Sequence, residues 1–279
     1  LYVFIKEQSI VVLILATDGQ APSIARLFPA ASWPERECRD GFGITFTGSF
    51  DERRLFLHET YPDGFYPLRK DTKNRPVAMK ERVAPDEEYP FRKVRGDGVY
   101  QVPVGPVHAG IIEPGHFRFS VIGEKIFNLE IRMFYKHRGI EKLCEGKSPD
   151  DCVAVAEAVS GDESVANATA FCTAVEKVSG IGVPHRAAHL RTILLELERI
   201  SSHLGDQAGM LVDVAFPLGA SQFTVLREEI MRMNGRLTGS RFLRGMVTTG
   251  GLSRDITDRE LAALREFLAT FRKRYRVGL

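Results

Sequence analysis

The chain has few cysteines, and none of them belongs to a C-x-x-C pair within its 279 residues. A disulfide framework and a self-contained zinc or iron–sulfur site both need clustered cysteines, so the sequence predicts neither. Isolated thiols are typical of buried small side chains in a reducing compartment. The four cysteines are Cys38, Cys144, Cys152 and Cys172.

Long hydrophobic runs and an excess of one charge are also missing. The apolar stretch Ile10 to Ala16 is much shorter than the roughly 20 residues needed to cross a bilayer, so a core β-strand explains it better. The 38 basic and 36 acidic residues leave a formal charge of +2, which does not favour nucleic acid or bulk anionic lipid as a partner. We expect a soluble protein with a protein partner, and Leu1 in place of Met favours a chain that has lost its natural start.

Hydrophobic periodicity predicts an α+β protein, with a strand-rich first part and a helical bundle after it. Apolar and β-branched runs predict two strands within residues 1–17 and further strands near residues 100–104, 116–121 and 125–134. Apolar residues at helical spacing predict helices over residues 150–159, 164–178, 184–205, 220–237 and 257–275. Thr257 and Glu260 have the spacing of a capping box at the start of the last helix.

The region from Gly105 to Leu143 concentrates proton-active side chains on tightly bent backbone. Glycine and proline are frequent there, and they force turns that hold neighbouring side chains at fixed positions. This is how a functional site is built on a strand-and-turn segment. The side chains concerned are His108, Glu113, His116, His137, Arg138 and Glu141.

The segment from Trp33 to Leu57 resembles the 30 kDa subunit of respiratory complex I. It reads WPERECRDGFGITFTGSFDERRLFL and is followed by YPLRKD, so the blocks E-R-E, D-x-F-G-I, D-x-R-R and P-L-R-K-D occur in the family's order. The glycines of the D-G-F-G block permit a tight turn. Four cations favour contact with a partner surface over a merely solvated face; they are Arg53, Arg54, Arg69 and Lys70.

The second part of the chain resembles the large subunit of group 4 [NiFe]-hydrogenases and the 49 kDa quinone-site subunit of complex I. The motifs are the E-P-G-H block at Glu113 to His116, the HRGIEK block from His137 and the RTILLELERISSHL block from Arg191. The charges of the last two blocks are expected to form buried or interface ion pairs, with plain surface positions as the alternative. In the hydrogenases a C-x-x-C pair that holds nickel follows the sheet, and the matching positions here read Ser160-Gly161-Asp162-Glu163.

The resemblance predicts a fusion of two domains, as in formate hydrogenlyase-type large subunits. Residues 1–75 form the 30 kDa subunit-like domain, residues 76–98 a polar, proline-containing linker, and residues 99–279 the hydrogenase large subunit-like domain. Family members continue to a second metal-binding motif, so the resemblance also predicts that the second domain is truncated at its C-terminus.

The resemblance implies a proton-active catalytic group of Glu113, His116 and Asp213. Glu113 matches the residue that relays protons from the metal site, His116 the histidine that meets the quinone headgroup, and Asp213 the acid that pairs with this histidine. His116, Phe171 and Asp213 would line a quinone-type cavity, but Phe171 stands where the quinone site has a tyrosine, so the hydroxyl donor is missing. A capped β-turn with His116 in a structural hydrogen bond is the alternative.

The Ser160-Gly161-Asp162-Glu163 block predicts that the nickel site is absent. Nickel bridged to iron requires soft thiolates, whereas a hydroxyl and carboxylates are hard ligands suited at most to magnesium or calcium. A simpler explanation is that the two acids satisfy the dipole at the start of the next helix. We therefore expect no metal to be bound by this chain.

These observations predict a hydrogenase-like large subunit of a membrane-attached, energy-converting oxidoreductase complex. It would dock on a small iron–sulfur subunit, lie peripherally on the cytoplasmic face of the inner membrane, and couple electron transfer to proton movement toward membrane subunits. Quinone is the one cofactor that the resemblance suggests for the chain itself. A quinone-reducing NADH dehydrogenase-like subunit and a non-catalytic assembly scaffold are the alternatives.

Overall fold

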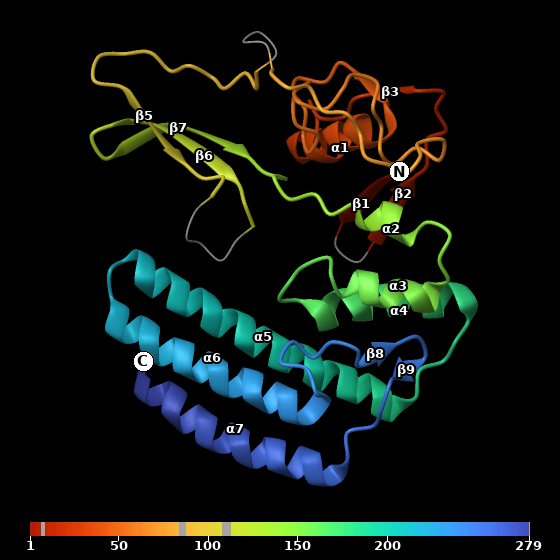
Figure 1. Ribbon diagram of the computed structural model, residues 1–279, viewed down its shortest axis with the longest axis vertical. Coiled ribbons are helices and arrows are strands. Elements are labelled where there is room, and N and C mark those ends of the chain that lie inside the picture. The colour runs from red at the N-terminus through yellow and green to blue at the C-terminus, as the bar shows by residue number, and fades with distance from the viewer. Residues whose placement is uncertain (7–8, 84–87, 108–112, 279) are drawn as a thin grey trace. The chain divides into compact units, whose positions relative to one another are not determined.

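The described residues form two compact units (Figure 1). The first comprises Leu1–His108 with Ile112–His137, and the second comprises Arg138–Leu279 with Ala109–Ile111. Short sheets dominate the first unit and helices the second, which confirms the predicted α+β class. His108 lies outside the described residues. The computed structural model describes residues 1–6, 9–83, 88–107 and 113–278.

The first unit begins with the two predicted strands and continues with elements that the sequence did not indicate. Strand β1 (Tyr2–Lys6) pairs antiparallel with β2 (Ser9–Leu13). The side chains of β2 are exposed, so the expectation of a core strand over Ile10 to Ala16 was wrong. Strand β3 (Gln20–Pro22) pairs in parallel with β4 (Thr45–Thr47). The connection between them contains a short 3-10 turn, η1 (Pro29–Ala31), and helix α1 (Ser32–Phe42).

The D-G-F-G block is the end of α1 instead of the isolated tight turn predicted from its glycines. Gly43 closes the helix with φ of 81°, a left-handed conformation that glycine adopts without strain. A Cβ at this position would lie 2.8 Å from the Tyr66 ring, so the site also needs the smallest residue. The helix was missed because Pro34 and two glycines weaken its pattern.

Three of the four cations predicted to face a partner pair with acids inside the first unit, Arg69 with Asp71 at 2.9 Å. Arg53 bonds Asp51 at 2.8 Å and Glu130 at 2.9 Å. Arg54 bonds Asp63 at 2.8 Å. Nearby acids engage these guanidinium groups, and their contact with a partner surface stays a prediction.

The rest of the first unit contains an antiparallel sheet of β5 (Tyr100–Val104), β6 (His116–Ile122) and β7 (Lys125–Arg132), which confirms the three predicted strands. The described parts of the predicted linker, residues 76–83 and 88–98, contain no helix or strand. Its aromatic residues are nevertheless packed. The guanidinium carbon of Arg132 lies 4.2 Å from the Tyr89 ring centroid, and that of Arg118 lies 3.9 Å from the Phe91 centroid.

The second unit is a bundle of helices in which α5 packs along α6, and α6 against α7 (Figure 1). A small hairpin of β8 (Val247–Thr248) and β9 (Gly251–Leu252) precedes α7. All five predicted helices are present. The helices are α2 (Ile140–Cys144), α3 (Pro149–Ala156), α4 (Ser164–Ser179), α5 (His185–Asp213), α6 (Pro217–Thr238) and α7 (Asp258–Gly278).

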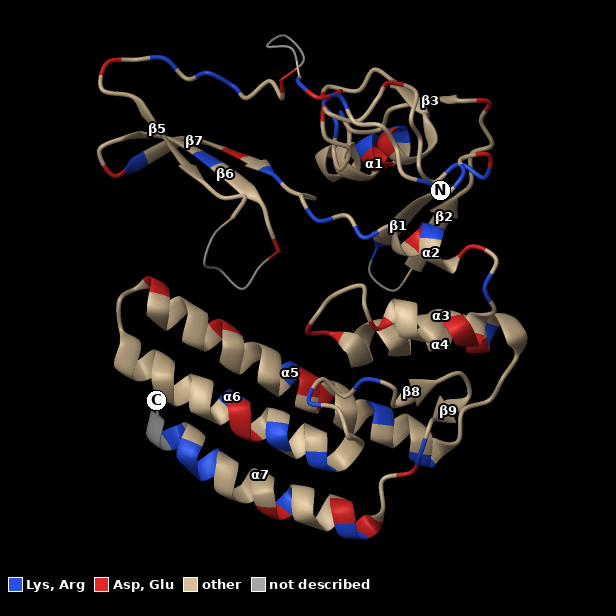
Figure 2. Ribbon diagram, viewed as in Figure 1, with Lys and Arg blue, Asp and Glu red and all other residues tan. Residues whose placement is uncertain are grey.

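Two details of the helices bear on the sequence predictions. Glu260 accepts the Thr257 N–H at 2.7 Å and donates its own N–H to the Thr257 hydroxyl at 3.3 Å, which confirms the capping box. Helix α5 passes through Gly205, where it was expected to stop. A Cβ on Gly205 would lie 3.1 Å from Arg227 Nε, so the glycine permits close packing instead of ending the helix. Basic residues gather in the last turns of α7 (Figure 2), where they complement the helix dipole.

A buried ion pair ties α4 to α5 in the core of the second unit. Arg191 donates to both Glu176 oxygens at 2.6 and 3.1 Å, and both side chains are about nine-tenths buried or more. Arg191 also donates to the carbonyl of Thr248 at 2.7 Å. By contrast, Glu196 and Arg199 of the same block pair on the surface at 3.5 Å. The expectation of buried ion pairs in this block is thus confirmed for Arg191 and wrong for the pair further along.

Contacts group residues 112–137 with the first unit, whereas the motifs assign residues 99–137 to the second predicted domain. Compactness and family membership divide a chain by different criteria, so the boundaries 1–75, 76–98 and 99–279 stay a prediction. No helix in the described part of the chain is both long enough and apolar enough to span a membrane.

Candidate functional site

His116 is buried at the start of β6, and protein groups engage both of its ring nitrogens. Nδ1 lies 3.1 Å from the Gly105 carbonyl oxygen, and Nε2 lies 3.3 Å from Nε of Arg118. A carbonyl only accepts and a guanidinium only donates, so these contacts fit a ring with its hydrogen on Nδ1 and Nε2 as the acceptor. The centroid of the Phe91 ring lies 5.1 Å from that of the imidazole, and the two rings are tilted relative to each other. This arrangement favours the structural hydrogen bond named as the alternative, and a ligand of Nε2 would have to displace Arg118.

Glu113 lies in the turn before β6 and faces solvent. Its carboxylate is 3.8 Å from Lys136 Nζ, and the two side chains are 46% and 52% exposed respectively. A pair this exposed contributes only about 0–1 kcal/mol. The E-P-G-H turn needs glycine at Gly115, because a Cβ there would lie only 2.8 Å from Met133 Sδ. The backbone of the motif therefore follows from close packing, and its acid can exchange protons with water.

The Ser160–Glu163 loop connects α3 to α4 in the second unit, and its acids do not cap α4. Glu163 occupies the N-cap position of α4 without a side-chain hydrogen bond to the helix. Asp162 lies 3.5 Å from Arg227 Nη2 and is 44% exposed. Their effect on the helix dipole stays a prediction, and the hydrogen bonds to the start of α4 come from another carboxylate.

That carboxylate is Glu198 of α5. Its two oxygens accept the backbone N–H groups of Val165 and Ala166 at 2.7 and 2.9 Å. These amides are among the first donors of α4, which have no partner within their own helix. Burial raises the pKa of Glu198; the two N–H groups oppose this shift, and the charges of Glu163 and Asp162 add to it.

The turn at Arg244 holds the same loop from the other side. Arg244 donates from Nη2 to the Gly161 carbonyl at 3.0 Å and from Nε to the Ser164 hydroxyl at 3.1 Å. The next residue, Gly245, donates its N–H to the buried Glu157 carboxylate at 2.7 Å. Burial raises the pKa of Glu157, an effect that this hydrogen bond opposes. Neither Glu198 nor Arg244 was predicted as a site residue; an acid within an otherwise apolar helix was the signal available for Glu198.

Phe171 and Asp213 occupy different environments within the second unit. Phe171 is partly buried and packs against the core formed by α4, α5 and their neighbours, so its ring has a packing role. Asp213 is the last residue of α5 and is exposed between Val212 and Val214. Glu113 and His116 belong to the first unit and Phe171 and Asp213 to the second. A shared cavity for these residues stays a prediction.

Among the described residues, no group of three or more His, Cys, Asp or Glu side chains is arranged to hold a metal ion. In the Ser160–Glu163 loop, the Asp162 carboxylate pairs with Arg227 of the protein itself. The chemistry of the loop fits arginine side chains and does not fit a thiolate-bound nickel centre.

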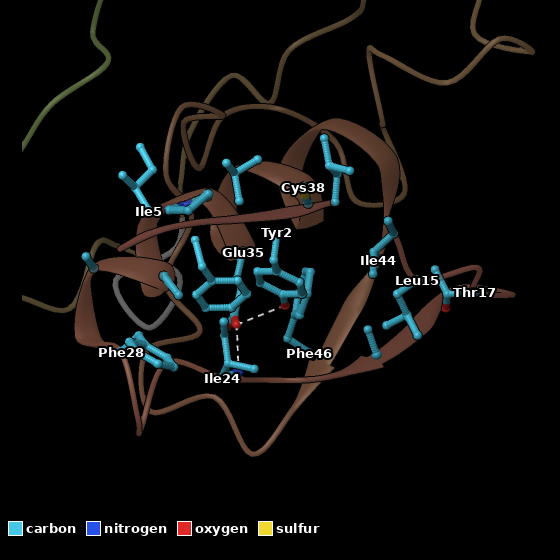
Figure 3. A pocket seen from close by; sticks show the side chains of 17 residues that line it. Tyr2, Ile5, Leu15, Thr17, Ile24, Phe28, Glu35, Cys38, Ile44 and Phe46 are labelled. Atoms are coloured by element: carbon cyan, nitrogen blue, oxygen red, sulfur yellow. Dashed lines mark hydrogen bonds between the residues drawn. The ribbon is translucent and has the colours of Figure 1, made fainter. Parts of the chain in front are cut away.

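A cavity of about 550 Å³ in the first unit has one polar wall (Figure 3). Glu35 from α1 accepts hydrogen bonds from the Tyr2 hydroxyl at 3.2 Å, the Ser23 hydroxyl at 2.6 Å and the Ile24 N–H at 2.8 Å. Burial raises the pKa of Tyr2 to about 12, and the Glu35 charge adds to this. Burial also raises the pKa of Cys38, so this thiol is not an activated nucleophile. The first acid of the E-R-E block thus joins β1 and the β3 region to α1.

Two family models match the chain. The model described as the respiratory-chain NADH dehydrogenase 30 Kd subunit matches residues 1–77. The model described as the respiratory-chain NADH dehydrogenase 49 Kd subunit matches residues 219–277. The two matches occur in the order that the sequence motifs predict.

Curated relatives extend these matches over most of the chain. Formate hydrogenlyase subunit 5 of Escherichia coli K12 is 40% identical over 263 residues, covering 92% of this chain and 46% of that protein. The C/D subunit of the NADH-quinone oxidoreductase of Phocaeicola vulgatus is 32% identical over 272 residues, covering 91% of this chain and 51% of that protein. The chain therefore spans about half the length of these relatives.

A solved structure shares the fold. A chain of the membrane-bound sulfane sulfur reductase, described as an archaeal respiratory membrane complex, aligns with a TM-score of 0.60 and 24% sequence identity. The alignment covers 65% of this chain and 48% of that chain.

Proposed function

Since this chain belongs to the family of group 4 hydrogenase large subunits and complex I 30 kDa and 49 kDa subunits, we propose that it is a hydrogenase-like large subunit without a nickel site. The whole protein would serve in a membrane-attached, energy-converting oxidoreductase complex. The observation that carries the proposal is the chemistry of the Ser160–Glu163 loop.

Serine and glutamate replace the two thiolates at this loop. Asp162 faces Arg227, the Gly161 carbonyl accepts from Arg244, and Ser164 accepts from the same guanidinium group. Two cationic side chains therefore contact the segment where the hydrogenases hold a metal centre. A nickel ion would have to compete with these guanidinium groups while being offered only hard oxygen ligands.

The partners of the whole protein follow from its relatives. We propose a small iron–sulfur subunit as the electron donor or acceptor, and membrane subunits as the recipients of proton movement or conformational strain. The complex would lie on the cytoplasmic face of the inner membrane. Glu113, His116 and Asp213 remain the proposed proton-active group, and its two exposed acids, Glu113 and Asp213, can exchange protons with water.

The experiment is a hydrogen assay on the purified complex with reduced methyl viologen as electron donor. We expect no hydrogen evolution, while a [NiFe]-hydrogenase assayed in parallel evolves hydrogen. Sustained hydrogen evolution by the complex that is lost on removal of this protein would refute the proposal.

Quinone reduction is the second candidate, because the C/D protein of an NADH-quinone oxidoreductase is 32% identical over 91% of the chain. It requires His116 and Asp213 at a headgroup. A quinone analogue should then bind the assembled complex and lose affinity in His116→Ala and in Asp213→Asn. The control is Asp206→Asn, an exposed acid on the same helix as Asp213. Absence of both quinone binding and turnover would leave an assembly scaffold as the function.

A further inference from the structure

The Ser160–Glu163 loop is followed by a helix start that is fixed by side chains distant in sequence. Glu198 reaches it from the middle of α5, and Arg244 from the turn after α6. Together they form hydrogen bonds to four groups of this segment: the Gly161 carbonyl, the Ser164 hydroxyl and the N–H groups of Val165 and Ala166. The loop backbone is thus tied to two other parts of the second unit.

The contribution of Glu198 cannot be replaced by water. Glu198 is 4% exposed and Val165 is 1% exposed, so solvent does not reach the N–H group that the carboxylate accepts. A buried donor left without an acceptor is costly, and a carboxylate is a stronger acceptor than a neutral oxygen. The position also disfavours glutamine, because an amide side chain would turn one N–H donor toward another.

The contribution of Arg244 depends on the shape of its guanidinium group. Nε and Nη2 point in fixed directions and contact Ser164 and Gly161 respectively. A lysine would carry the same charge but could not donate from two positions of a rigid fork. The turn that presents Arg244 is itself held by Glu157, which accepts the Gly245 N–H.

We propose that Glu198 and Arg244 form a latch that holds the Ser160–Glu163 loop and the start of α4 in place without a bound metal centre. Both are positioning residues, since they act on the loop backbone. The inference rests on the proposed absence of nickel, but it makes a separate statement about which residues order residues 160–166.

Hydrogen–deuterium exchange of the full-length, chelator-treated protein tests the latch. In Glu198→Gln, the amides of Val165 and Ala166 should exchange at least about ten-fold faster, because one of them loses its acceptor. Glu196→Gln is the matched control, since Glu196 lies on the same helix but pairs with Arg199 at the surface. Its exchange at Val165 and Ala166 should match that of the unchanged protein.

Arg244→Lys tests the latch from the other side and stands even if the Glu198 variant does not fold. Exchange across residues 161–164 should rise, while Arg232→Lys, which changes an exposed arginine of α6, should have no effect there. Unchanged exchange in both latch variants would overturn the inference. So would protection of residues 160–166 that appears only after metal ions are added.

The latch and the proposed function fail in different ways. Stoichiometric nickel in the full-length protein would refute the function, whereas the exchange rates are measured on protein stripped of metal. Fast exchange at residues 160–166 in the unchanged, nickel-free protein would refute the latch and leave the function standing.

Discussion

Asp40 in the first unit and Glu198 in the second are buried carboxylates with the same structural task. Each is 4% exposed and accepts backbone N–H groups from a distant segment. Asp40 Oδ2 accepts three, from Leu55, Phe56 and Leu57, at 2.8, 3.1 and 3.1 Å. Glu198 accepts two, one with each oxygen. Both carboxylates therefore organise backbone that has no partner of its own.

The charges around the two acids differ. Asp40 has the guanidinium group of Arg39 at 4.0 Å. Glu198 instead has the acids Glu163 and Asp162 nearby, and their charges add to the rise of its pKa. Arg39 thus offsets the charge of Asp40, whereas Glu198 lies beside two acids, and the cations Arg227 and Arg244 contact the adjoining loop.

The largest effect should come from Asp40→Ala, which leaves three buried donors without an acceptor. We expect the free energy of unfolding to fall by roughly 3 kcal/mol. Trp33, the only tryptophan of the chain, lies in α1 and reports on this unit by fluorescence during urea unfolding. Asp40→Asn is the control, because a single oxygen accepts all three bonds and the amide retains one. Equal losses in both variants would show that the charge and not the acceptor matters.

Glu198→Ala should cost less, about 1–2 kcal/mol, although the carboxylate is equally buried. Two donors are lost instead of three, and removal of the charge relieves repulsion from neighbouring acids. The loss should appear in the helical circular dichroism signal, while the Trp33 transition stays at its original urea concentration. A loss larger than that of Asp40→Ala would contradict the comparison.

The pH dependence of stability should distinguish the two acids further. The pKa of Glu198 is raised above 4.5 in the folded protein, so folding binds its proton more tightly than the unfolded chain does. This contribution to stability is complete below pH 4.5 and is lost as the pH rises through the folded pKa. As the pH rises from 4.5 through the folded pKa of Glu198, the melting temperature of Glu198→Gln should therefore fall less than that of the unchanged protein. Thermal melting curves recorded at each pH measure this difference. Parallel curves for both proteins would be inconsistent with the raised pKa.

The smallest effect is expected for Asp162→Asn. It removes an acid that disfavours ionised Glu198, but it also weakens the partly exposed pair with Arg227. These changes oppose each other, so the free energy of unfolding should change by less than about 0.5 kcal/mol. The pH dependence assigned to Glu198 should nevertheless become shallower. Thermal melting at two pH values measures both quantities, and a large loss of stability would mean that Asp162 has a structural role.

Regular elements with strong periodicity were predictable from the sequence. The five predicted helices, the strands β5, β6 and β7 and the Thr257 capping box depend on local patterns, and the structure contains them all. Helix α1 and the short strands β3, β4, β8 and β9 were not predicted. Their local pattern is weak, and contacts with distant residues stabilise them, as Asp40 and Arg191 show.

The sequence predicted the loop of the candidate site but not the side chains that contact it. The replacement of thiolates by Ser160 and Glu163 is visible in the sequence, but the residues that hold this loop are not. Glu198 lies in α5, after the whole of α4, and Arg244 lies after α6, so no local sequence spacing connects either residue with the loop. The partners of His116 were likewise hidden, because Gly105 reaches it only through the pairing of β5 with β6.

Elemental analysis of the full-length protein, purified from cells supplied with nickel, tests the central claim most directly. The account predicts no stoichiometric nickel, since a serine, a glutamate and two guanidinium groups occupy the loop that would hold it. One nickel ion per chain would contradict it.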